Sequence, residues 1–309
     1  MCCRWFVLAV PTLLVLYGCT ALATNRDSWL AHHIVPTRRS LESSSDADSL
    51  AAAALLRWPQ DLLVDSAAAH PQALDLLGRA VAADPSRPEF VSLQIQGCSS
   101  VPGCNSESME ARLRELDPGN GLGWLGLVRR AGDSGDQDTL DAALTQLAKT
   151  DHVDLYWTRL VAELSAAAKH GGNLSFRESE VAIIGALGAE AIPAFNSLSA
   201  SCKDDELSRP RRVEICKGVA RTLQQGDTYI TEMLGVAIAK RVWAEQSPEW
   251  AAATGARRLY EYRRAHFSAI RNSERDAARL LELCRNHRRE QDVLLAELID
   301  AGVGPNPPD

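Results

Sequence analysis

The chain has 309 residues, of which 46% are hydrophobic and 24% charged, and its formal net charge is −7. This composition is that of a globular protein with a sizeable core, and the mild acidity argues against general nucleic-acid binding. Aromatic residues make up only 6% while alanine is abundant, which favours packed helices over a β-sandwich.

The first eighteen residues have the pattern of a secretory signal peptide. Arg4 precedes an apolar run from Trp5 to Tyr17, which is long enough for a signal sequence but too short to span a bilayer. The run ends in Leu16-Tyr17-Gly18-Cys19, which resembles the lipobox of bacterial lipoproteins.

This resemblance implies that residues 1–18 are removed and that Cys19 is acylated, as in palmitate-bearing lipoproteins. Thr20 follows in place of the aspartate associated with inner-membrane retention in that family. We therefore expect a lipid anchor in the outer membrane, with the protein facing the periplasm. The alternatives are an ordinary secretory signal with an incidental cysteine, or a buried helix.

Residues 19–46 are polar and lack lasting periodicity, so we expect a flexible tether. The pair His32-His33 within it is typical of solvated side chains rather than of a metal site. Helices are predicted from Asp46 onward, with Pro59 and Pro71 at first helical positions.

A period of 33–34 residues organises residues 47–170. Turn signals stand at Asp84, Asp117 and Asp151, and an aromatic residue follows each turn six or seven residues later, at Phe90, Trp124 and Trp157. This spacing is typical of helical hairpins that stack as a solenoid. The predicted fold class is all-α.

Residues 71–164 resemble tetratricopeptide repeats. Trp124 and Leu127 match the aromatic and leucine positions of that family, and Gly135-Asp136 matches its interhelical turn; Val128, Ala131 and Leu140 depart from it, so the repeats are degenerate. The resemblance implies a concave surface that binds a protein or peptide. We expect Phe90, Trp124 and Trp157 to be buried between hairpins, with Trp124 the most deeply packed.

Residues 171–301 are predicted to continue as a C-terminal α-helical region without the period, and residues 302–309 as a disordered tail. Ser175 and Glu178 form a capping-box pattern. A further helix carries Ala277, Leu280, Leu281 and Cys284 on one face.

The cysteines beyond Cys19 indicate disulfides, because an exported chain lies where disulfides persist. Short loops suited to bridging predict the pairs Cys98–Cys104 and Cys202–Cys216, with Cys284 left as a buried thiol. Other pairings remain open at this stage.

No motif for catalysis, phosphate binding or cofactor binding is present, so catalytic, cofactor and metal residues are predicted to be none. Cys284 and His287, with His266 nearby, have the start of a zinc spacing but lack a second close pair. Residues 40–160 hold eighteen carboxylates against nine Lys and Arg, so a charged partner of the repeats would be basic.

Two functions follow from this pattern. The first is a non-catalytic envelope lipoprotein whose helical repeats bind another envelope protein or a peptide, held at the membrane by its anchor. The second is an envelope enzyme, or an accessory subunit of one, with a site in the C-terminal helices. The oligomeric state is not predicted.

Overall fold

The computed structural model describes residues 30–61, 69–99, 101–172, 174–189, 195–270 and 274–307. In chain order its helices are η1 (Leu30–Ile34), α2 (Val35–Glu42), α3 (Ala47–Asp61), α4 (Ala69–Ala83), α5 (Pro88–Ser99), α6 (Glu107–Leu116), α7 (Leu122–Ser134), α8 (Gln137–Leu147), α9 (Trp157–His170), α10 (Phe176–Ala189), α11 (Phe195–Ser201), α12 (Asp204–Leu207), α13 (Arg212–Gln224), α14 (Tyr229–Val242), α15 (Pro248–Ile270), α16 (Glu274–Asn286) and α17 (Glu290–Asp300). The fold is all-α, as predicted.

Local sequence signals set many of the helix ends. The Ser175 hydroxyl accepts the Glu178 N–H, and the Glu178 carboxylate accepts the Ser175 N–H, which is the reciprocal pairing of a capping box. The Asp136 side chain likewise accepts the Thr139 N–H at the start of α8. Gly135, which closes α7, has φ of 73°, a conformation that favours glycine.

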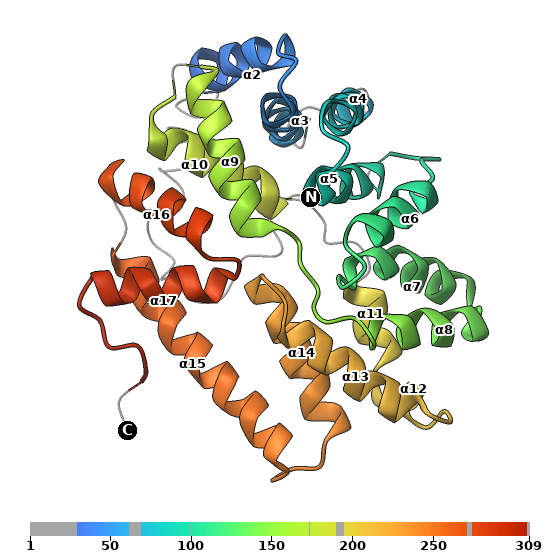
Figure 1. The fold of residues 1–309 in the computed structure, drawn as a ribbon. Helices are drawn as coiled ribbons and strands as arrows, with labels where there is room; N and C mark the ends of the chain where they lie inside the picture. Colours follow the sequence, from blue (N-terminus) through green and yellow to red (C-terminus); the bar gives the residue numbers. More distant parts are fainter. Residues whose placement is uncertain are drawn as a thin grey trace, which may run out of the picture.

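The helices form a closed ring of packed pairs (Figure 1). From α3 to α8 each helix packs on the next, α8 packs on α13, and α13 packs on α14. The ring continues through α15, α17 and α16, and it closes because α16 packs on α9 and α9 packs on α3. A solenoid unit touches only its neighbours, whereas α9 packs on both α3 and α16, so the predicted solenoid arrangement is not confirmed.

Two of the turns predicted from the 34-residue spacing lie side by side. The Gly121 N–H donates to the His152 carbonyl at 2.8 Å, and the Asp151 N–H donates to the Gly119 carbonyl at 2.9 Å. The buried Asn120 carboxamide donates to the Asp154 carbonyl and accepts the Asp154 N–H, both at 2.9 Å. The spacing therefore reflects a real contact between successive turns.

Both predicted disulfides are present. Cys98 and Cys104 are bonded, as are Cys202 and Cys216. Cys284 on α16 is buried and is not part of a disulfide, in agreement with its apolar helix face.

The predicted tether is wrong for residues 30–42. There α2 packs against α3 and α9, and η1 packs against α2, with Ile34, Thr37 and Leu41 buried. Polar residues between these three hid the buried face, because only every third or fourth side chain points to the core. Residues 1–29, which include Cys19, the expected signal peptide and part of the tether, lie outside the described residues.

Two further predictions need correction. Pro59 does not begin a new helix, because α3 runs through it to Asp61. Residues 302–307 of the predicted disordered tail lie on α15, where the Tyr262 hydroxyl donates to the Gly304 carbonyl at 3.1 Å.

The repeated aromatics differ in burial. Phe90 is fully buried, whereas Trp124 and Trp157 are half-buried at the edge of the core. The prediction that Trp124 is the most deeply packed is therefore wrong. Its ring lies under the Arg114 guanidinium, 4.7 Å from the ring centre, which keeps one face of the indole near solvent.

None of the helices in the described ranges combines the length and apolarity needed to cross a bilayer.

Candidate functional site

A polar joint fixes the helices that surround the main cavity. The buried Asp227 carboxylate precedes α14 and accepts the N–H groups of Leu155 and Trp157 at the start of α9, at 2.7 and 2.8 Å. Burial and the neighbouring Asp154 carboxyl raise the pKa of Asp227 well above its usual range. The Asp227 carbonyl accepts the Glu290 N–H at the start of α17. One residue thus ties α9, α14 and α17 together.

Above this joint lies a cavity of about 730 Å³. Residues of α5, α9, α10, α14, α15, α16 and α17 line it, so it is built by members of the helix ring that are far apart in sequence. Its walls are mostly apolar, with Val161, Ile184, Leu187, Phe267, Leu280 and Leu294 among them. Cavities of this size with apolar walls and a few polar groups are typical of small-molecule sites.

One end of the cavity carries polar groups. The Tyr229 N–H donates to the Glu290 carboxylate at 2.8 Å, and the Tyr229 ring lies against that of Tyr260. Burial, together with the negative charge of Glu232, raises the pKa of Glu290 to about 7. The Tyr229 side chain is 93% buried, and its hydroxyl has no hydrogen-bond partner among the described residues. A bound molecule can supply that partner.

The wall formed by α10 is open. A Cβ added at Gly185 or Gly188 would meet no atom within 4 Å, although both residues line the cavity. Val181 on α10 and Ile230 on α14 also line it, and they are 52% and 56% exposed. Exposed large apolar side chains that gather on one cleft mark a binding surface.

Arg264 stands at the exposed rim of this cavity. It lies one helical turn beyond Tyr260 on α15, and Phe267 follows about one turn further, so all three share a face. Within the described part of the chain, Arg264 makes no ion pair. The buried thiol of Cys284 and the buried Glu180 complete the lining.

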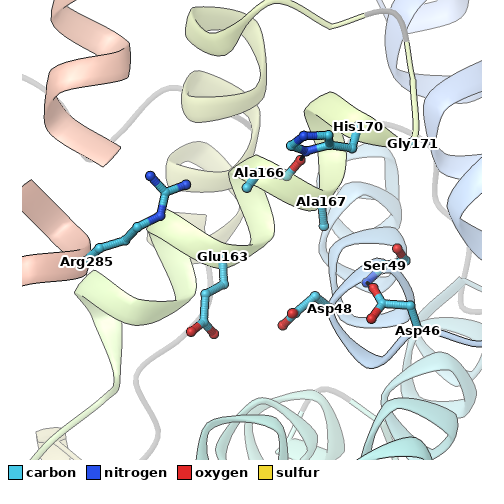
Figure 2. Close-up of a pocket in the computed structure, with 9 residues that line it drawn as sticks. All are labelled: Asp46, Asp48, Ser49, Glu163, Ala166, Ala167, His170, Gly171 and Arg285. Carbon is cyan, nitrogen blue, oxygen red and sulfur yellow. Dashed lines mark hydrogen bonds between the residues drawn. The ribbon is translucent and has the colours of Figure 1, made fainter. Parts of the chain in front are cut away.

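A second, polar cleft of about 470 Å³ lies between α3, α9 and α16 (Figure 2). The carboxylates of Asp48 and Glu163 project into the same space from α3 and α9, and Arg285 approaches from α16. Arg87, on the segment before α5, pairs with both carboxylates and with the buried Glu89.

The charges in this cleft are largely balanced within the protein. Burial raises the pKa of Asp48 and of Glu163, and the Arg87 guanidinium opposes this rise. Arg159 adds a second cation beside Glu89, at 3.3 Å. An ion-pair network in this cleft therefore joins α3, α5 and α9. Its acidic residues contribute to the excess of carboxylates over Lys and Arg in residues 40–160.

The structure places the residues singled out from the sequence in different regions. Of the aromatic series only Trp157 lines the cavity, while Phe90 belongs to the core. The described side chains include no group of three or more His, Cys, Asp or Glu that could hold a metal ion. His33 lies 3.8 Å from Glu178 and is part of the packed N-terminal helices.

Sequence reasoning missed Glu290, Tyr229 and Arg264. One signal was available: Tyr260, Arg264 and Phe267 repeat at helical spacing on α15. The contact between Tyr229 and Glu290 left no local signal, because 61 residues separate them.

Comparison of the chain with protein-family models, curated proteins and solved structures gives no match. The fold and the site are therefore argued from this chain's own geometry.

Proposed function

We propose that this protein binds an apolar small molecule in the cavity between α9, α10 and α14–α17. The observation that supports the proposal is the coincidence of open apolar walls with a buried polar end. Contact of the apolar Val181 and Ile230 side chains with water is unfavourable. Burial of the Tyr229 hydroxyl without a hydrogen-bond partner among the described residues is unfavourable too. A guest that covers Val181 and Ile230 removes the first penalty, and a polar atom of the guest or a water that enters with it removes the second.

The lipid anchor belongs to the same proposal. Acylation of Cys19 would hold the cavity beside the outer membrane on the periplasmic side, where apolar molecules are concentrated. Mass spectrometry of the mature N-terminus tests it, since we expect a modified Cys19. Cys19→Ala should release the protein from the membrane fraction, and a variant that stays membrane-bound would contradict the anchor.

Filling the cavity tests the binding function. Gly185→Leu places a side chain in open space, so we expect the full-length chain to lose at least tenfold in affinity for the neutral probe N-phenyl-1-naphthylamine. Gly255→Leu is the matched control, because Gly255 is also helical and unhindered but lies outside the cavity lining. Equal probe binding by wild type and Gly185→Leu would refute the proposal.

An enzyme with its site in these C-terminal helices is the second candidate. It is favoured by Glu290, because a carboxyl whose pKa is about 7 suits proton transfer at neutral pH. Incubation with 4-nitrophenyl dodecanoate checks it. An enzyme acting on such a guest releases 4-nitrophenol and loses this activity in Glu290→Gln, whereas a binding protein leaves the ester intact.

The predicted repeat scaffold, which would bind a protein or peptide, remains a separate proposal. Closure of the ring through α9 leaves less open concave surface than a solenoid offers. We therefore place the ligand site in the cavity rather than along the repeats.

A further inference from the structure

The placement of charge around the cavity carries information about the guest. Glu180 and Glu290 are its acidic groups; Glu180 is buried and Glu290 is half-buried. Arg264 is its cationic group, and it lies at the exposed rim. An anion is therefore disfavoured deep in the cavity and favoured at its mouth.

The apolar surface runs inward from the same rim. Arg264 shares a face of α15 with Tyr260 and Phe267, about one turn away on either side, so a group bound by Arg264 lies directly beside apolar rings. Across the cavity, Gly185 and Gly188 leave open space on α10. A molecule with a charged head and a narrow apolar chain fits this arrangement.

We propose that the guest is a free single-chain amphiphile with an anionic head group, such as a fatty acid, whose chain fills the cavity and whose carboxylate binds Arg264 at the rim. This inference rests on the proposed binding function and names its ligand class. The alkyl chain covers Val181 and Ile230, and the Tyr229 hydroxyl, which a hydrocarbon cannot hydrogen-bond, is left to water that enters with the guest. Arg264 selects the guest because its guanidinium makes paired hydrogen bonds with a carboxylate.

The test compares three guests that share one chain and differ in head-group charge. Dodecanoate, dodecan-1-ol and dodecyltrimethylammonium displace N-phenyl-1-naphthylamine from the full-length chain at pH 8. We expect dodecanoate to bind at least tenfold more tightly than dodecanol, and dodecyltrimethylammonium to bind most weakly. Decanoate, shorter by two methylenes, should bind about tenfold more weakly than dodecanoate.

Arg264→Gln separates the head-group contact from the cavity. We expect it to weaken dodecanoate about tenfold and to leave dodecanol unchanged. Arg258→Gln is the matched control, because Arg258 lies on the same helix but outside the cavity lining, and it should change neither affinity.

Several outcomes would overturn the inference. Equal binding of dodecanoate and dodecanol in both wild type and Arg264→Gln would show that the site does not select an anionic head group. The apolar cavity would still be the binding site. Tighter binding of dodecyltrimethylammonium would assign the site to cations. Failure of Gly185→Leu to affect any guest would refute the binding function as well.

Discussion

Two helices of the ring, α7 and α10, use glycine in opposite ways. In α7, a Cβ added at Gly126 would collide with the carboxylate of Glu110 on α6. Glu110 is buried and cannot easily move, because Arg130 binds both of its oxygens and Ser106 binds one. In α10, a Cβ added at Gly185 would meet nothing within 4 Å.

The two glycines therefore have different roles, one in packing and one in the cavity. Glycine in α7 lets two helices approach closely, which is a requirement of the core. Glycine in α10 has no such role, and it costs helix stability relative to alanine. What it provides is space in the cavity. The contact between α6 and α7 is thus part of a packed frame, and the exposed face of α10 leaves room for a guest.

The largest effect is expected in the packed frame. Phe90→Ala removes a fully buried ring and should lower the free energy of unfolding by about 3–5 kcal/mol. Trp124→Ala should cost less, because that residue is only partly buried. Thermal and urea melts of the two variants measure the loss of stability. A Trp124→Ala protein less stable than Phe90→Ala would contradict the order expected from burial.

A smaller effect is expected at the polar end of the cavity. Since the pKa of Glu290 is raised from 4.5 to about 7, its folded form binds the proton more tightly than its unfolded form. Its contribution is therefore fully present below about pH 4.5 and is lost as the pH rises to about 7. Glu290→Gln should raise stability at pH 8 by on the order of 2–3 kcal/mol.

Urea melts between pH 4 and pH 8 follow this effect. The wild-type chain should lose stability across that window more steeply than Glu290→Gln. Asp227 has a raised pKa too, so a shallower slope of the same sign should remain in the variant. Parallel curves for the two proteins would show that Glu290 does not titrate near pH 7.

Gly126→Ala tests the close contact between α6 and α7. The added methyl group displaces the Glu110 carboxylate from Arg130, so we expect a loss of about 1–3 kcal/mol despite the better helix propensity of alanine. A variant as stable as wild type would mean that Glu110 moves freely. Exchange of the α7 amide hydrogens should be faster in the variant.

The smallest effect is the same change on the other side of the ring. Gly185→Ala should stabilise the protein by about 0.5–1 kcal/mol, because alanine is the better helix former and meets no neighbour there. Together with Gly126→Ala, this pair compares one methyl group in two settings. Destabilisation by Gly185→Ala would show that α10 is more tightly packed than the structure indicates.

Features set by a few neighbouring residues could be predicted from the sequence. The capping box at Ser175, the left-handed Gly135 and the two short-range disulfides depend on residues close in the chain. The period of 33–34 residues also identified turns that touch, as Gly121 and His152 show.

Features set by distant contacts could not be predicted. Closure of the ring depends on α3, α9 and α16, which no local pattern connects. The raised pKa of Glu290 arises from burial among helices that are remote in sequence. Burial of Ile34 and Leu41 in an otherwise polar stretch depends in the same way on α3 and α9 being already in place.

The closed ring also orders the events of folding. Helix α9 needs α3 on one side and α16 on the other, and more than a hundred residues separate α9 from α16 along the chain. Such long-range contacts form slowly, because the intervening loop must close before they contribute. During synthesis or export from the N-terminus, α3 to α8 can assemble first, but the apolar face of α9 stays uncovered until α16 emerges. A chain that stops before residue 274 therefore exposes that face, which makes such truncated products substrates for chaperones and proteases.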